Sequence, residues 1–108
     1  MKKIGILTCR KVGLTCTGAG CFKVYNAKEK AFERYKDEDV QLSVFFDCSG
    51  CDADKKTDAG FLKKMRRLKE NDIEIVHLSQ CIGDECPHRN EIIDALKNNE
   101  IEIVEGTH

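Results

Sequence analysis

The sequence predicts an α/β domain in which helices cover both faces of a four-stranded, mostly parallel sheet, giving three layers. Short apolar runs rich in branched residues alternate with longer segments of helical period, in the order strand, helix, strand, helix, strand, helix, strand. Each connecting segment is long enough for a right-handed crossover between parallel strands. The 108 residues contain no linker, low-complexity stretch or internal repeat. Residues 1–108 are therefore expected to form a single domain.

The four predicted strands are short runs of branched and aromatic apolar residues, which suit the buried surface of a parallel sheet. These runs lie at residues 4–7, 40–46, 73–78 and 101–104. The expected strand order is 2-1-3-4, as in one half of a flavodoxin-like fold. In that arrangement the loops that follow the strands share the carboxyl edge of the sheet, where ligands of such folds bind.

Each of the three segments between the strands carries apolar residues at helical spacing. Such a stripe predicts a helix that buries one face against the sheet. The stripes consist of Phe22, Tyr25, Phe32 and Tyr35, then of Phe61, Met65 and Leu68, and finally of Ile92, Ile93 and Leu96.

The composition predicts a cytoplasmic protein with reduced thiols. The apolar segment at residues 4–7 is far shorter than the core of a signal peptide, and no stretch approaches the roughly 20 apolar residues of a membrane span. In that compartment, seven cysteines indicate metal ligands or redox groups more readily than disulfides. The net charge of −1, with both signs interspersed, predicts no nucleic-acid partner and no membrane contact.

Most of the cysteines follow the ends of predicted strands. Cys9 follows the first strand, Cys48 and Cys51 follow the second, and Cys81 follows the third. Adjacent strands lie about 4.8 Å apart, and a tetrahedral zinc ion with Zn–S bonds of about 2.3 Å needs its sulfurs roughly 3.8 Å from one another. Thiols just past neighbouring strand ends can therefore bind one metal ion. The sequence predicts such a site at the carboxyl edge of the sheet.

Two local clusters sharpen this prediction. In the segment 48–51, a two-residue spacer lets both sulfurs bind one metal, and Gly50 provides the freedom for a positive φ in a tight turn. In the loop after the third strand, Cys86 and His88 follow Cys81. Pro87 suits the first position of the third helix, which would put Cys86 at the N-cap, beside the positive end of that helix.

Other candidates have two interpretations. Cys16 and Cys21 could be further ligands or form a second site, although Cys21 could equally pack as a small apolar residue. His88 could bind the metal or remain in the loop, and His108 is either a ligand or part of a tail. His77 lies within a strand and is expected to be a hydrogen-bonded sheet residue. Arg10, Lys11 and Arg89 are the cations nearest in sequence that could offset thiolate charge.

Taken together, the cysteine motifs resemble those of the CGGC-domain proteins, small prokaryotic proteins regarded as metal binders. The likeness runs from the cysteine after the first strand to the closing Gly106-Thr107-His108, and it departs at Ser49, where the family name has a glycine. It implies a single CGGC-like metal-binding domain, with zinc the expected metal, and it implies no established reaction. The motif positions that it implies are Cys9, Cys16, Cys21, Cys48, Cys51, Cys81, Cys86, His88 and His108.

Two other functions remain open alongside a zinc site. Four thiolates also suit an iron–sulfur cluster. A thiol–disulfide oxidoreductase would use Cys48 as the attacking thiolate and Cys51 as its resolving partner, but residues 52–56 separate Cys51 from the expected helix cap at Thr57. Nucleotide or flavin binding has only the fold in its favour, because no glycine-rich phosphate motif directly follows a strand. No catalytic residue is predicted.

Overall fold

The computed structural model describes residues 2–13, 15–80, 82 and 86–107. The elements, in chain order, are β1 (Lys2–Thr8), α1 (Arg10–Gly13), α2 (Ala19–Ala27), the 3-10 helix η1 (Lys30–Tyr35), β2 (Val40–Asp47), α3 (Ala59–Glu70), β3 (Ile75–Leu78), α5 (Arg89–Asn98) and β4 (Glu102–Glu105).

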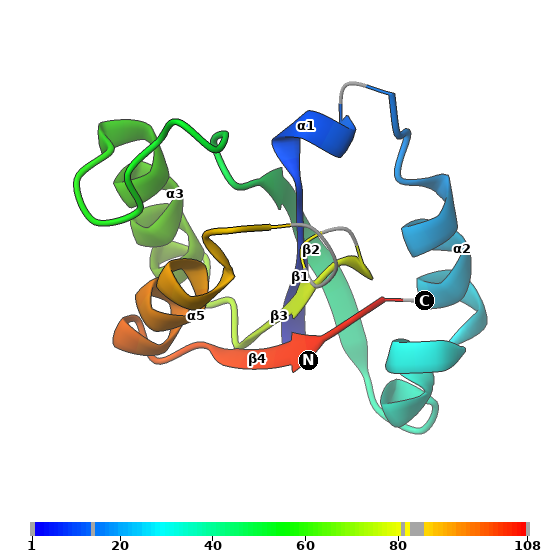
Figure 1. Ribbon diagram of the computed structural model, residues 1–108. Coiled ribbons are helices and arrows are strands. Elements are labelled where there is room, and N and C mark those ends of the chain that lie inside the picture. The colour runs from blue at the N-terminus through cyan, green and yellow to red at the C-terminus, as the bar shows by residue number, and fades with distance from the viewer. Residues whose placement is uncertain (1, 14, 81, 83–85, 108) are drawn as a thin grey trace.

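The four strands form one parallel sheet in the order β2-β1-β3-β4, which confirms the predicted topology. Helices α3 and α5 cover one face, and α2 with the segment that follows it covers the other (Figure 1). Leu7 of β1 lies opposite both Phe46 of β2 and Leu78 of β3, so these three strands reach the carboxyl edge in register. Loops that are far apart in the sequence therefore begin side by side.

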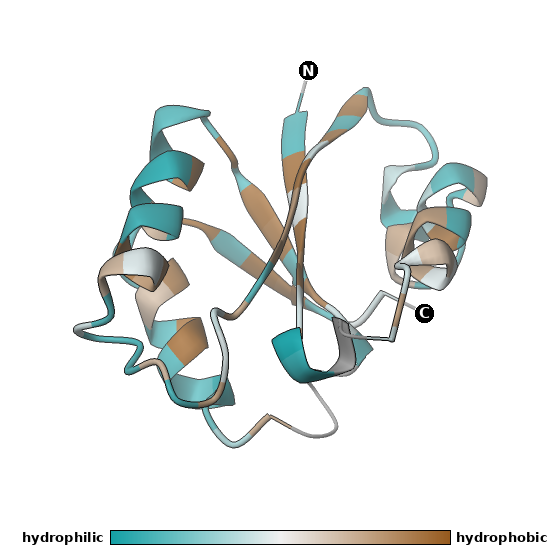
Figure 2. Ribbon diagram, turned by 90° about the horizontal axis from the view of Figure 1, so that it is seen from above, coloured by the Kyte–Doolittle hydropathy of each residue, from teal (hydrophilic) through white to brown (hydrophobic). Residues whose placement is uncertain are grey.

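The sheet separates two apolar cores. Alternate residues of β3 point to opposite faces, so Val76 and Leu78 pack toward α3 and α5 while Ile75 packs toward α2 and η1. All four residues of β3 are buried, which explains why its residues other than His77 are all apolar. Seen from above, hydrophobic segments run along the central strands, and hydrophilic stretches lie on the helices to either side (Figure 2).

The first crossover differs from the single helix that the apolar stripe predicts. Helix α2 ends at Ala27, and both Lys28 and Lys30, which is the first residue of η1, have positive φ, at 55° and 52°. Phe32 and Tyr35 are buried by η1, whereas Phe22 of α2 is 38% exposed and stacks on the exposed ring of Phe45. The break reorients the chain, so the four aromatic residues do not share one helical face.

The hydroxyl of Tyr25 binds the outer side of β2, which is an edge strand. It accepts a hydrogen bond from the backbone N–H of Leu42 at 3.1 Å and donates one to the backbone carbonyl of Val40 at 3.4 Å. Because both backbone groups face away from β1, this single side chain pairs two polar groups that a strand edge otherwise leaves open.

His77 is fully buried in the sheet and is hydrogen-bonded on both ring nitrogens, as the sequence predicts. Nδ1 lies 3.2 Å from the carbonyl oxygen of Gly106, and Nε2 lies 2.7 Å from the hydroxyl oxygen of Tyr35. A carbonyl only accepts, so Nδ1 carries the proton of the neutral ring and Nε2 accepts from Tyr35. Burial lowers the pKa of His77 to about 4 and raises the pKa of Tyr35 to about 12.

Gly5 leaves the space for a close approach between β1 and β2. The pairing register shifts between Ile4 and Gly5, and a Cβ atom at Gly5 would overlap the Cγ2 methyl of Val44. We expect Gly5→Ala to lower the free energy of unfolding by about 1–3 kcal/mol, because a buried strand cannot easily yield to the added methyl. Denaturant titration measures this loss. It should shrink when Val44 is also changed to alanine, and equal losses in both backgrounds would contradict this explanation.

Candidate metal centre

The ends of β1 and β2 bring two thiols together. Thr8 and Asp47 are register partners, and the backbone N–H of Cys48 donates to the carbonyl of Thr8 at 3.1 Å. Cys9 and Cys48 are the residues that directly follow these two strands. Their side chains are only 5% and 2% exposed and belong to the same apolar core, under α3 and α5. The prediction that Cys9 and Cys48 lie at the same edge of the sheet is confirmed.

A tight turn positions the second thiol of the segment 48–51. The carboxylate of Asp47 accepts a hydrogen bond from the backbone N–H of Ser49 at 2.8 Å, and both Ser49 and Gly50 have positive φ, at 68° and 99°. The predicted positive φ at Gly50 is thus confirmed, and Ser49 shares it. The turn leaves Cys48 buried and Cys51 exposed. The two sulfurs of this segment therefore differ in their access to solvent.

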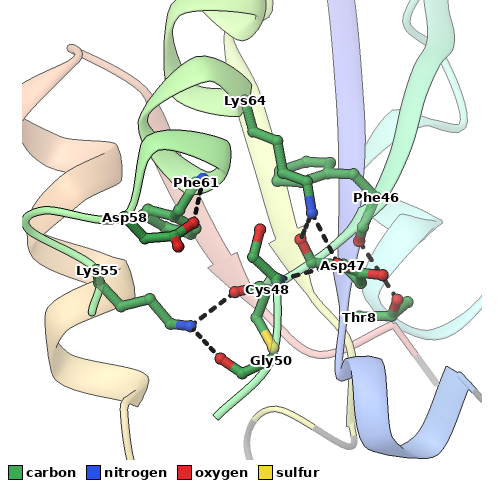
Figure 3. Close-up of polar contacts among 10 residues, drawn as sticks. Thr8, Phe46, Asp47, Cys48, Gly50, Lys55, Asp58, Phe61 and Lys64 are labelled. Carbon is green, nitrogen blue, oxygen red and sulfur yellow. Dashed lines mark hydrogen bonds and ion pairs between the residues drawn. The ribbon is translucent and has the colours of Figure 1, made fainter. Parts of the chain in front are cut away.

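Asp47 is fixed by Lys64 of α3. The ammonium lies 2.7 Å from the carboxylate and 2.9 Å from the backbone carbonyl of Asp47 (Figure 3). Burial alone would raise the pKa of Asp47, but hydrogen bonds from Lys64 and Ser49 outweigh burial and lower it. The carboxylate therefore stays ionised and keeps the turn closed.

Lys55 contacts the same turn and is not among the residues predicted from the sequence. Its side chain is 4% exposed, and its ammonium donates to the backbone carbonyls of Cys48 and Gly50, each at 2.7 Å (Figure 3). In the sequence it stands in a polar run beside Lys56, which is exposed. No signal in the sequence distinguishes these two lysines.

Cys86 comes from a third loop and packs against the core that contains Cys9 and Cys48. Burial raises the pKa of Cys86, a hydrogen bond with the backbone of His88 opposes this, and the charges of Cys48, Cys9 and Cys51 raise the pKa further. Three thiols from two other loops thus lie within electrostatic reach of Cys86.

The start of α5 differs from the sequence-based prediction. This helix begins at Arg89 with His88 as its N-cap, so Pro87 is not its first residue and Cys86 is not the cap. The turn at residues 87–88 separates the Cys86 thiol from the helix end. Among the predicted cations, Arg10 lies against Gly50 and lowers the pKa of Asp47, whereas Arg89 forms an ion pair with Glu105.

His88 is oriented by a carboxylate. Its Nδ1 lies 3.0 Å from Glu91 in the first turn of α5. Cys51, His88 and Glu91 contribute to the lining of one pocket of about 330 Å³, together with residues 52–56. Histidines that bind metals commonly pair their second nitrogen with a carboxylate, so this arrangement leaves Nε2 as the nitrogen suited to a ligand role.

The remaining predicted ligands lie elsewhere or outside the described residues. Cys21 is buried in the core under α2 and η1, where its sulfur lies 3.4 Å from the hydroxyl of Thr107. Cys16 is exposed, and its sulfur accepts from the backbone N–H of Gly18. Cys81 and His108 fall outside the described residues. The structure therefore groups Cys9, Cys48, Cys51 and Cys86, buries Cys21 in the opposite core and leaves Cys16 exposed in the loop before α2.

The donor chemistry of this edge suits a soft or borderline metal, because thiolates bind zinc and iron–sulfur clusters. In the part of the chain that the structure describes, no three His, Cys, Asp or Glu side chains form a group that could hold a metal ion. No helix among the same residues has the length and apolar character of a membrane span.

Fold and thiols together define a small α/β protein with a cysteine-rich loop region at the carboxyl edge of a parallel sheet. Residues 3–108 match the model of the CGGC domain, and the chain belongs to this family. It is 38% identical to an uncharacterized protein of Methanocaldococcus jannaschii over 117 aligned positions, which cover 98% of this chain and 86% of that relative. No solved structure matches the chain significantly. Family membership and the grouped cysteines are compatible with metal binding.

The geometry gives less support to thiol–disulfide exchange. The predicted attacking residue, Cys48, is almost fully buried, while Cys51 is exposed. Helix α3 begins at Ala59 with Asp58 as its cap, one residue later than the predicted cap, and Asp58 accepts a hydrogen bond from the backbone N–H of Phe61. The positive end of α3 is thus seven residues beyond Cys51 in the sequence. A helix dipole acts mainly within the first turn of its helix, so it has little effect on the Cys51 thiol.

Proposed function

We propose that the protein binds a transition-metal ion, with zinc favoured, at the carboxyl edge of its sheet. The ligands would come from Cys9, Cys48, Cys51 and Cys86, with Cys81 and His88 as further candidates. The observation that carries this proposal is the convergence of three loops: Cys9, Cys48 and Cys86 pack at one core, and the charges of Cys9, Cys48 and Cys51 all act on Cys86. Thiolates are the preferred protein ligands of structural zinc.

Closing a coordination shell would require the loops to draw together, because the described side chains do not by themselves form a metal-holding group. A bound cation supplies the driving force, since it removes the mutual repulsion that otherwise opposes thiolate formation at Cys86. Zinc is favoured over iron because mixed cysteine and histidine donors suit it, and His88 is already oriented by Glu91.

Elemental analysis of anaerobically purified protein tests the proposal. We expect stoichiometric zinc in a colourless protein, and we expect Cys48→Ser to lose most of it because a hydroxyl is a poor replacement for a thiolate. Cys16→Ser is the matched control and should retain the metal, because Cys16 is exposed and does not belong to the core that contains Cys9 and Cys48. A brown protein with visible absorption would identify an iron–sulfur cluster instead. Unchanged metal content in Cys48→Ser would remove Cys48 from the ligand set.

If the purified protein contains no metal and cannot be loaded with it, the proposal fails. In that case, reversible conversion of Cys48 and Cys51 between dithiol and disulfide at a cellular potential would establish the redox function. Alkylation followed by mass spectrometry, after equilibration in glutathione buffers, measures this conversion. The two outcomes separate metal binding from thiol exchange in the same preparation.

A further inference from the structure

Lys55 is a buried ammonium group beneath the segment that carries Cys48 and Cys51. Both of its hydrogen bonds go to backbone carbonyls of that segment, at Cys48 and Gly50, and the ring of Phe61 lies 5.3 Å from Nζ. Among the described residues, no carboxylate forms an ion pair with it. Lys64, by contrast, binds the same turn through the carboxylate of Asp47.

This environment is unusual for a lysine, because a buried charge normally has a charged partner. Two carbonyls and an aromatic face stabilise an ammonium only in part. The carbonyls that it binds belong to the residues that set the positions of two thiols. A negatively charged thiolate cluster above this segment would supply the missing counter-charge, since four thiolates around Zn²⁺ carry a net charge of about −2.

We infer that Lys55 is a positioning residue for the metal centre: it fixes the Cys48–Cys51 turn and offsets the negative charge of the metal–thiolate cluster. This inference rests on the proposed function. Its first part follows from the two hydrogen bonds that Lys55 donates to the turn, while the ring of Phe61 in α3 lies beside the same ammonium. Its second part follows from burial, because an ammonium in a low-dielectric site acts more strongly on nearby charge than one in water.

Zinc affinity of single variants tests the inference, with zinc ion as the probe and a chromophoric chelator as the competitor. Lys55→Met removes both the hydrogen bonds and the charge, and we expect it to weaken zinc binding by about 10–100-fold, the usual effect of losing a supporting contact around a metal site. Lys55→Arg keeps charge and donors and should stay closer to the wild-type Kd. Lys56→Met, at the exposed neighbouring lysine, should leave the Kd unchanged.

The free energy of unfolding of each metal-free variant separates positioning from general stability. An unchanged Kd in Lys55→Met would overturn the inference while leaving the proposed function intact, whereas a wild-type protein that binds no zinc would overturn both. If Lys55→Met does not fold, Lys55→Gln provides the test, because its amide donates hydrogen bonds but carries no charge. A Kd in Lys55→Gln equal to that of Lys55→Arg would overturn the charge-offset part.

Discussion

Zinc added to the metal-free, reduced protein should raise its free energy of unfolding by about 4 kcal/mol when free zinc is 1,000 times its Kd. The physical reason is that the proposed ligands come from three separate loops, after β1, after β2 and before α5, and only the folded chain holds them together. Guanidinium titration with buffered zinc, compared with the same titration in a chelator, measures the difference. The midpoint should shift while the slope stays constant.

Variants make this prediction specific. Cys48→Ser should lose most of the zinc-dependent stabilisation, and Cys16→Ser should keep it, because Cys16 is exposed and does not belong to the core that contains Cys9 and Cys48. Stabilisation that persists in Cys48→Ser would show that zinc binds elsewhere on the chain. Equal stability with and without zinc in the wild type would contradict the proposed centre.

Acidification should destabilise the metal-free protein through His77. The pKa of this residue falls from an ordinary value of 6.5 to about 4 on folding, mainly because burial disfavours the charged ring. Between these two values the unfolded chain binds the additional proton, so stability is fully present above about pH 6.5 and is lost as the pH falls toward 4. The contribution of this one group is up to about 3 kcal/mol, at about 1.4 kcal/mol for each pKa unit.

Replacement of His77 by glutamine isolates this contribution. A glutamine amide can donate toward Gly106 and accept from Tyr35, but it does not titrate, so the slope of stability against pH between 4 and 6.5 should become shallower. His88→Gln makes the same substitution at a partly exposed histidine and is the matched control. The comparison cancels the carboxyl groups that titrate in the same range. An identical slope in the His77 variant and the wild type would contradict the assignment.

The sheet was predictable because its signal is local and repeated. Each strand is a compact apolar run, the crossover lengths permit parallel pairing, and the order β2-β1-β3-β4 is the one expected of a flavodoxin-like half. The same argument places Cys9 and Cys48 together, because both follow paired strand ends. Residues whose positions depend on the strand ladder are therefore the ones that sequence reasoning places correctly.

The remaining features depend on three-dimensional context. The break after α2 arises from positive φ at Lys28 and Lys30. The sequence does not indicate this break, because lysine ordinarily favours helix. Cys21 faces the opposite core because of the direction in which α2 packs, which loop spacing does not specify. Lys55 and Lys56 are chemically identical neighbours, and only the path of the chain buries one of them.

The hydroxyl of Tyr25 also bears on how the molecule behaves at high concentration. An exposed edge strand can pair with a strand of another chain. The edge at β2 also carries the exposed ring of Phe45. By engaging Val40 and Leu42, Tyr25 withdraws one donor and one acceptor from that edge. An incoming strand would have to displace the phenol first, which guards this side of the protein against aggregation.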